Sequence, residues 1–296
     1  MAEKGARSIM TTTAPDGEMR RVRSGDVELF FRLFGKPQRA PVIILHGLSY
    51  FSYDWIHVGR ELAHDRQVVA MDMRGFGDSS FSSKQDYSLP AFANDVLAVA
   101  DASGWSRFVV LGHSMGGRNA AYCSVEHAAR VRALVLVDYS PANAPEGARR
   151  VAETVGGAPE VFASVEAAMR YFRSDPHSPH DAAMRLRMDA YLRPVSGGYA
   201  IKRDPYFREH FRRILETGQR PKLGVDMWEI VTRISCPALL VRGTRSDMLT
   251  SESAQKMAGA NSLLQVSEVE TGHNVAGEKP EELIARVRQF FFRNDL

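Results

Sequence analysis

The sequence has 296 residues, enough to bury a large core as one domain or as one domain with an insertion. Hydrophobic residues make up 44% and charged residues 25%, the balance of an ordinary soluble globular protein. The 38 Lys and Arg residues against 35 Asp and Glu residues leave a formal net charge of +3, and no long basic run occurs. We therefore do not expect a nucleic-acid partner.

The N-terminal segment MAEKGARSIMTTTAPD lacks the apolar stretch of a signal peptide. We expect a flexible N-terminus over residues 1–18 and a cytoplasmic protein. No apolar run approaches the roughly 20 residues of a membrane span, so a membrane partner is not expected. Cys123 and Cys236 lie in apolar segments, which favours buried thiols over a disulfide. The oligomeric state, monomer or homodimer, stays open.

Short apolar runs alternate with amphipathic segments along most of the chain. The runs predict strands at residues 27–35, 41–47, 67–75, 108–112, 131–141, 236–243 and 262–269. Helical spacing of apolar residues predicts helices at 92–104, 115–129 and 280–292. This alternation predicts an α/β protein with a mostly parallel central β-sheet and helices on both faces.

The strand signals stop between residues 142 and 230. This region holds helical patches such as VEAAMRYF and HDAAMRLRMDAYL, broken by SDPHSPH and RPVSGG. We predict a helical cap over 142–230, inserted between core segments 19–141 and 231–296.

A serine boxed by glycines follows the apolar run at 108–112. The segment from Gly112 to Gly116 fits G-x-S-x-G between a predicted strand and a predicted helix. Small neighbours let a tight turn close around a nucleophile, and the following helix directs its N-terminal amides at developing charge. Ser114 is therefore the candidate nucleophile, and the alternative is a glycine-rich turn without chemistry.

A serine nucleophile needs a base and donors for the oxyanion. His273, in the loop TGHNVAGEKPEEL after the last predicted strand, opens at the same sheet edge and is the candidate base. The backbone amides of Leu48, after His46-Gly47, and of Met115 are candidate oxyanion donors. The alternative for the His-Gly pair is a polar turn.

The motifs HGLSYFSYDW, DMRGFGDSS, GHSMGG and TGH, with the cap region between the last two, follow one another in this order. In this the chain resembles the α/β-hydrolase fold family over nearly all of residues 20–292. The resemblance implies a hydrolase with Ser114 as nucleophile, His273 as base and the amides of Leu48 and Met115 as oxyanion hole. Epoxide hydrolases and haloalkane dehalogenases of this family carry Asp at the nucleophile position, whereas this chain carries Ser.

The acid of the triad has two candidates. Its usual position in the family, three residues beyond the glycine matched by Gly243, is Ser246, with Asp247 one residue later. The chain is similar to a subgroup of small-acyl esterases and an acetamidomethylene-succinate hydrolase, which has a D-x-x-P segment after an earlier strand. In VLVDYSP that residue is Asp138, which we favour, with Asp247 as the alternative and the other carboxylate structural.

Substrate-binding candidates lie around these residues. Arg118, one helical turn after Ser114, is expected either to bind a substrate carboxylate or to form an internal salt bridge with one of the two aspartates. The candidates for the acyl pocket, with a core position as the alternative for each, are Tyr139, Trp55 and Phe51. A direct role for Asp72 or Arg74 is not expected.

Together these features predict a cofactor-independent serine hydrolase without a metal site, acting on an ester, thioester or activated amide of a small to medium substrate. One alternative is hydrolysis of a carbon–carbon bond in a ring-opened dienoic acid, with Arg118 as a carboxylate clamp. Another is a ligand-binding receptor with very slow turnover on the same fold.

Overall fold

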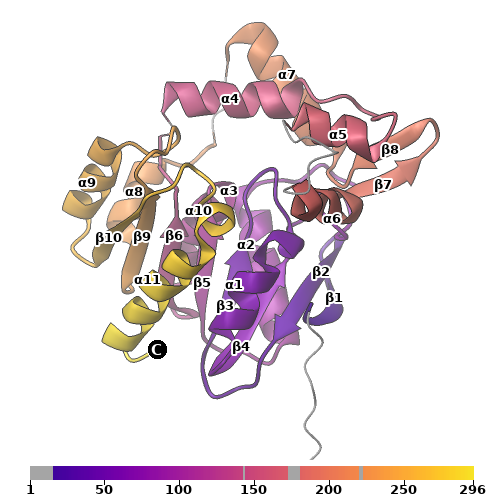
Figure 1. Cartoon of the computed structure of the whole chain (residues 1–296). Helices are drawn as coiled ribbons and strands as arrows, with labels where there is room; N and C mark the ends of the chain where they lie inside the picture. The colour runs from indigo at the N-terminus through magenta and orange to yellow at the C-terminus, as the bar shows by residue number, and fades with distance from the viewer. Residues whose placement is uncertain (1–15, 143, 173–180, 220–222) are drawn as a thin grey trace, which may run out of the picture.

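A computed structural model of the chain describes residues 16–142, 144–172, 181–219 and 223–296. Within these ranges eight strands form one sheet, in the order β1-β2-β4-β3-β5-β6-β9-β10 (Figure 1). In this sheet, six neighbouring strands are parallel to one another: β4, β3, β5, β6, β9 and β10. Strand β2 runs antiparallel to β4, and β1 runs antiparallel to β2. Their bounds are β1 Glu18–Ser24, β2 Val27–Phe34, β3 Arg39–Leu45, β4 Arg66–Met71, β5 Phe108–His113, β6 Val131–Val137, β9 Ala238–Gly243 and β10 Leu264–Val269. The flexible N-terminus predicted for 1–18 falls mostly on residues 1–15, outside the described ranges.

The central strands bury both of their faces, which explains why they are continuous apolar runs. Successive side chains point to opposite sides of a sheet. Accordingly, Ile43 and Val110 belong to one buried cluster, while Ile44 and Leu111 belong to another. The first cluster includes residues of α2 (Leu89–Ala102), α3 (Met115–Glu126), α8 (Met227–Arg233) and α9 (Ser251–Ala260). The second includes residues of α1 (Ile56–Leu62), α10 (Val275–Glu278) and α11 (Pro280–Arg293). The predicted α/β class with helices on both faces is confirmed.

The elements from α4 to α7 lie over the carboxyl ends of the parallel strands (Figure 1). In this cap α4 packs against α7, and α5 against α6. The bounds are α4 Pro145–Gly156, α5 Val165–Tyr171, α6 Ala182–Tyr191, β7 Leu192–Val195, β8 Gly198–Ile201 and α7 Pro205–Thr217. The predicted break SDPHSPH, residues 174–180, lies entirely outside the described residues.

Two features of the cap differ from the sequence prediction. Besides its helices, the cap holds a hairpin that the sequence did not predict, because β7 and β8 pair antiparallel where a break between helices was expected. Gly197 and Gly198 turn the chain with φ of 85° and 147°, a conformation that glycine adopts without strain. In addition, α8 crosses the predicted boundary at 230/231 and packs against α3 and α9 of the core.

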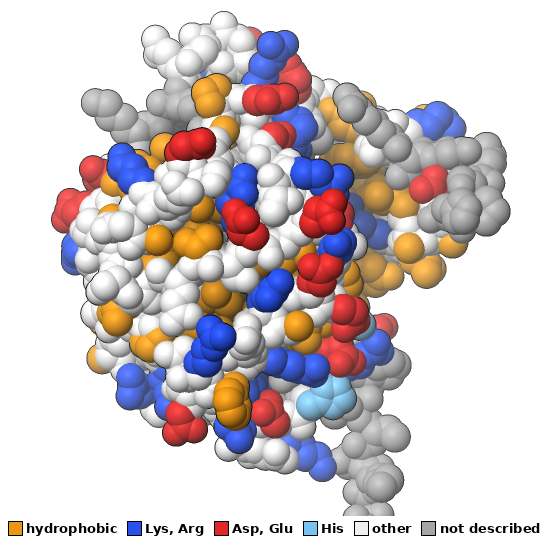
Figure 2. Space-filling model, turned by 60° about the vertical axis from the view of Figure 1, so that its left-hand side comes forward, with side chains coloured by type: hydrophobic (Ala, Val, Ile, Leu, Met, Phe, Trp, Pro, Cys, Tyr) orange, Lys and Arg blue, Asp and Glu red, His pale blue; other side chains and the backbone are white. Residues whose placement is uncertain are grey.

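The charges on the surface are mixed. Figure 2 shows Lys and Arg side chains interspersed with Asp and Glu side chains over the face it presents. Within the described ranges, no helix combines the length and apolar character that crossing a bilayer requires.

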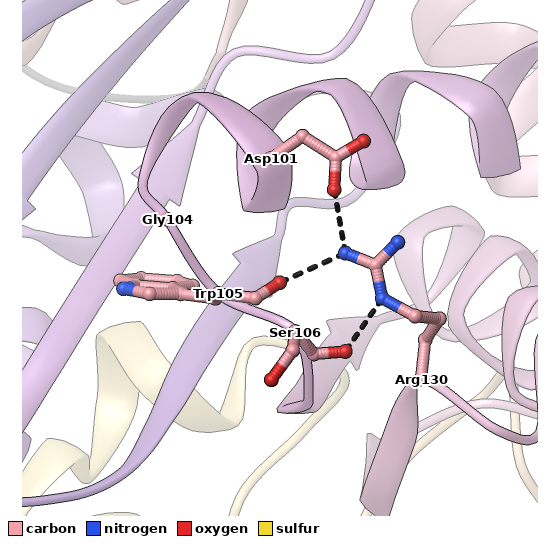
Figure 3. Close-up of a pocket in the computed structure, with 5 residues that line it drawn as sticks. All are labelled: Asp101, Gly104, Trp105, Ser106 and Arg130. Carbon is pink, nitrogen blue, oxygen red and sulfur yellow. Dashed lines mark hydrogen bonds and ion pairs between the residues drawn. The ribbon is translucent and has the colours of Figure 1, made fainter.

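A hollow on the core surface, beside the C-terminal end of α2, is lined by Asp101, Gly104, Trp105, Ser106 and Arg130 (Figure 3). The Arg130 guanidinium donates to Asp101 Oδ1 at 2.6 Å and to the backbone carbonyls of Trp105 and Ser106 at 2.8 and 2.6 Å. These bonds tie the end of α2 to the start of β5 and β6. Because this arginine already has three acceptors, the hollow has a structural role.

Candidate active site

Ser114 lies in the tight turn between β5 and α3. Its backbone has φ 53° and ψ −115°, a strained conformation for a residue with a side chain. The glycines on either side are required by close packing. A Cβ on Gly112 would stand 2.2 Å from the Gly116 carbonyl oxygen, and a Cβ on Gly116 would stand 2.3 Å from the Leu45 carbonyl oxygen. The turn therefore closes only with glycine at these two positions.

A continuous chain of hydrogen bonds runs from Ser114 into the sheet edge. His273 Nε2 lies 2.9 Å from Ser114 Oγ, and His273 Nδ1 lies 2.7 Å from Asp138 Oδ2. An ionised carboxylate only accepts hydrogen bonds, so Nδ1–H donates to Asp138 and Nε2 accepts from the serine hydroxyl. The His273 side chain is 11% exposed and that of Asp138 is fully buried. The three residues come from the ends of β5, β6 and the loop after β10.

The carboxylate of Asp138 is held by its neighbours. Its Oδ1 accepts the Gly243 backbone N–H at 2.8 Å, and its Oδ2 accepts the Ser246 hydroxyl at 2.5 Å. Ser246 thus stands at the family's usual acid position and donates to the candidate acid Asp138. The sequence motifs predict no role for Ser246. A hydroxyl at a position that usually carries the acid was the available signal.

Asp247 makes a different contact. Its two carboxylate oxygens accept from Nε and Nη2 of Arg150 in α4 at 2.5 and 2.8 Å. This pair joins the loop after β9 to the cap. Of the two candidate acids, the structure therefore brings Asp138 to His273 and pairs Asp247 with the cap.

Leu48 and Met115, whose backbone amides are the candidate oxyanion donors, line the cavity together with Ser114 and His273. Among the described residues, neither amide donates to a protein acceptor. His46 fixes the loop that carries Leu48. Its Nε2 accepts the Met73 backbone N–H at 3.0 Å, and its Nδ1–H donates to the Gly47 carbonyl at 2.7 Å. Burial lowers the pKa of His46 to about 4, so the ring is neutral at neutral pH.

His113, the residue before the nucleophile, was not among the predicted site residues. Its buried ring donates Nε2–H to the His273 backbone carbonyl at 2.9 Å, which fixes the loop that carries the candidate base. Burial and the neighbouring His273 ring hold the pKa of His113 well below its usual value, so it stays uncharged. Gly47 makes room for this ring, because a Cβ there would lie 2.8 Å from His113 Nδ1.

Comparisons with known proteins identify the family. The family model described as alpha/beta hydrolase fold matches residues 40–280. The chain belongs to the α/β-hydrolase fold family. A 3-hydroxybutyrate-oligomer hydrolase of Cupriavidus necator is 27% identical over 87% of this chain and 90% of its own length. A 2-(acetamidomethylene)succinate hydrolase of Mesorhizobium japonicum is 25% identical over 92% and 94%, respectively.

One relative matches only in part. This α/β-hydrolase is 28% identical to mouse epoxide hydrolase 4 over 120 residues, so it spans about a third of that protein (33%). Among solved structures, an α/β-hydrolase from Novosphingobium aromaticivorans is 29% identical over 94% of this chain and 99% of its own, with a TM-score of 0.77.

The cavity of this α/β-hydrolase, about 1900 Å³, lies between the sheet edge and the cap. Ser114, His273, Arg118 and Tyr139 line it, with apolar side chains of α4 and α7. Phe51 and Trp55 do not line it, contrary to the acyl-pocket expectation. Each is 2% exposed, because Phe51 stacks on Tyr191 of the cap and Trp55 packs in the core beneath the site.

The motif DMRGFGDSS has a structural role. Asp72 is fully buried and accepts the backbone N–H groups of Ser52 and Asp78 at 2.6 and 2.8 Å. Arg74 forms a bidentate pair with buried Asp95, with two bonds of 2.7 Å. These contacts fix the loop after Leu48, the segment that carries a candidate oxyanion donor, and tie the DMRGFGDSS loop to α2. Within the described ranges, no group of three or more His, Cys, Asp or Glu side chains is arranged to hold a metal ion.

Proposed function

We propose that this protein is a cofactor-independent serine hydrolase that cleaves an ester, thioester or activated amide of a small to medium substrate through an acyl-enzyme. The proposal is carried by the hydrogen-bonded chain Ser114–His273–Asp138, at 2.9 and 2.7 Å, which opens into a large cavity. The relatives that match over most of their length are named hydrolases, which agrees with this reaction class.

In the first half of the reaction, Ser114 Oγ attacks the substrate carbonyl carbon while its proton passes to His273 Nε2. Asp138 stabilises the imidazolium through Nδ1–H and keeps the ring oriented. The amides of Leu48 and Met115 donate to the oxyanion of the tetrahedral intermediate, and each such donor contributes about 3 kcal/mol of transition-state stabilisation. The intermediate collapses to an ester on Oγ, and the leaving alcohol, thiol or amine takes the proton from Nε2.

In the second half, a water molecule gives a proton to His273 Nε2 and its oxygen attacks the acyl carbon. The second tetrahedral intermediate collapses, Ser114 Oγ recovers the proton, and the carboxylic acid leaves. The neutral His46 and His113 support both halves, because they hold the loops of the oxyanion donor Leu48 and of the base without adding positive charge. The cap excludes bulk water and selects the substrate.

Labelling with a fluorophosphonate probe tests the proposal, because an activated serine displaces fluoride and retains the phosphonyl group. We expect rapid labelling of the wild-type protein, with the adduct located on Ser114 by peptide mass spectrometry. Ser114→Ala abolishes labelling, whereas Ser49→Ala, a serine that lines the same cavity, retains it. A wild-type protein without an adduct on Ser114 overturns the proposal. Cleavage of a ring-opened dienoic acid without ester hydrolysis replaces it with carbon–carbon bond hydrolysis.

A further inference from the structure

Arg118 lies in the first turn of α3, four residues after Ser114, and lines the same cavity. Residues four apart lie on one face of a helix, separated by about 6 Å along its axis. The guanidinium is half-buried and its Nε and Nη2 groups lie 3.3 and 3.4 Å from Asn119 Oδ1. These long contacts to a neutral amide leave most of its five N–H donors available.

The arginines of the cavity differ in their partners. Arg149 pairs with Glu153, Arg150 with Asp247 and Arg187 with Asp54. Among the described residues, Arg118 has no carboxylate partner. The internal salt bridge that was one of two expectations for Arg118 is therefore not formed. Asp138 is bonded to His273, Ser246 and Gly243, and Asp247 to Arg150.

The surroundings of Arg118 are costly for an unpaired cation. Burial lowers the pKa of its guanidinium, and the Tyr139 side chain is the neighbour that opposes this effect. The Tyr139 hydroxyl is itself buried without a hydrogen-bond partner, in a residue that lines the cavity and is 4% exposed. A half-buried cation beside a buried, unsatisfied hydroxyl is destabilising unless an anion enters from the cavity.

We propose that Arg118, with Tyr139 beside it, binds a carboxylate of the substrate, so that the enzyme acts on carboxylate-bearing esters or thioesters. The inference rests on the proposed function, because it assigns the substrate class of the same site. A planar guanidinium fork matches a carboxylate with two parallel hydrogen bonds. One helical turn between Arg118 and Ser114 sets the carboxylate a few bonds from the carbonyl that is attacked.

Four esters test the inference and identify which side of the bond carries the charge. Monoethyl succinate carries its carboxylate on the acyl group, and ethyl butyrate is its neutral match. 3-Acetoxypropanoate carries it on the alcohol, and propyl acetate is its neutral match. Hydrolysis is followed by acid release in a pH-stat. We expect kcat/KM for one charged ester to exceed that of its neutral match by about tenfold or more.

Variants of Arg118 show whether this residue causes the preference for the charged ester. Arg118→Met brings the charged-to-neutral ratio to one or below, and Arg118→Lys, which keeps the charge but not the fork, gives an intermediate ratio. Arg149→Met is the matched control, because Arg149 lines the cavity but its side chain is 79% exposed and paired with Glu153, so the wild-type ratio is retained. Equal kcat/KM within both pairs of esters, or a preference that persists in Arg118→Met, overturns the inference.

Binding separates this inference from the proposed function. Calorimetric titration of Ser114→Ala with monoethyl succinate and 3-acetoxypropanoate needs no catalysis. We expect binding of the preferred ester, weakened about tenfold or more when Arg118→Met is added. If binding depends on Arg118 but no ester is hydrolysed by the wild type, the carboxylate site stands and the proposed hydrolysis falls. If neutral esters are hydrolysed and neither charged ester binds more tightly than its neutral match, hydrolysis stands and the carboxylate site falls.

Discussion

The sheet edge and the cap meet at one cavity but are held by different interactions. At the sheet edge the site residues stand at strand ends, and Ser114 and Asp138 adopt positive φ values of 53° and 47°. Buried hydrogen bonds and contacts to glycine fix them, as at Gly116. Such strain persists only where the surrounding packing over-determines it.

The cap is joined to the core by ion pairs, in addition to backbone hydrogen bonds and aromatic packing. Arg187 of α6 pairs with Asp54, Arg150 of α4 with Asp247, and Lys202 with Asp78. Pairs of this kind, partly exposed to water, contribute little each and tolerate exchange. The difference teaches that buried backbone geometry fixes the candidate catalytic residues, whereas partly exposed ion pairs of the cap can be replaced at small cost. The two candidate acids illustrate it, since Asp138 belongs to the rigid edge and Asp247 to a cap contact.

Replacing each of the two aspartates by asparagine tests this difference between sheet edge and cap with the largest expected effect. Asp138→Asn lowers kcat/KM for a short-chain ester by about 10⁴-fold, because the amide no longer orients His273 or stabilises its charged form. Asp247→Asn lowers it by less than about tenfold, since it loses only a cap contact. Steady-state kinetics on both variants, with circular dichroism to check folding, measure the difference. Comparable losses in both would mean that cap and edge are not separable.

Glycine substitutions sharpen the same comparison through stability. Gly116→Ala places a Cβ 2.3 Å from the Leu45 carbonyl oxygen, so we expect a loss of about 3 kcal/mol in the free energy of unfolding. Gly259→Ala is its control in α9, where the added Cβ meets nothing within 4 Å. There the change stabilises by about 0.5–1 kcal/mol. Urea unfolding measures both, and a tolerated alanine at 116 contradicts tight packing of the edge.

Protonation provides a third test, because the sheet edge holds a buried histidine. The pKa of His46 is about 4 in the folded protein, against an ordinary value of 6.5. Between these values the unfolded chain binds more protons, so the stability that His46 contributes at neutral pH is lost as the pH falls from 6.5 toward 4. Between pH 7 and pH 5 this amounts to about 2 kcal/mol.

Urea unfolding at the two pH values measures this effect in the wild type and in His46→Gln, and the difference isolates it. The variant is needed because other groups also titrate in this range. Burial raises the pKa of Asp72 to about 6, so the stability that Asp72 contributes changes with pH in the opposite direction. We expect His46→Gln to remove about 2 kcal/mol of acid destabilisation. His64→Gln, whose side chain is 69% exposed, retains it. An unchanged pH dependence in His46→Gln would place the sensitive group elsewhere.

The contrast between edge and cap also explains what sequence could predict. The signals for the strands and for the tight turn at Ser114 are local in sequence. An apolar run followed by two required glycines places Ser114 at a strand end independently of the cap. His273 followed from strand order, because carboxyl ends of parallel strands meet at one edge. The preference for Asp138 over Asp247 came from the resemblance to the subgroup with a D-x-x-P segment. The partner of Asp247 could not be predicted, because Arg150 lies 97 residues away and an ion pair leaves no periodic pattern.

Other elements were missed for physical reasons. The strand β1 reads EMRRVRS, whose exposed charged side chains at the sheet edge lack an apolar run. The hairpin β7–β8 has strands of four residues each, too short for an alternation to stand out. For Phe51 and Trp55, aromatic character does not distinguish a pocket wall from a core. Burial decided that question, and it depends on contacts with Tyr191 and on packing beneath the site.

Two of the ion pairs between cap and core give the smallest expected effects and a contrast within the cap itself. The side chains of Arg187 and Asp54 are 18% and 14% exposed, whereas those of Arg150 and Asp247 are 48% and 25% exposed. Arg187→Met leaves Asp54 partly buried without its partner, and we expect a loss of about 1.5 kcal/mol in stability. Arg150→Met costs less than about 1 kcal/mol, because water and salt already screen the pair.

Thermal unfolding at low and high salt measures both, alongside KM for the preferred ester. The same cap helices line the cavity, so we expect KM to rise in Arg187→Met while kcat falls less than in any variant of the triad. Arg187 also donates to the carbonyl of Ser49, the residue after the candidate oxyanion donor Leu48. Replacing Arg187 therefore also removes a contact to the site, whereas replacing Arg150 does not. A kcat loss as large as that of Asp138→Asn would show that this cap contact belongs to the catalytic geometry rather than to substrate selection.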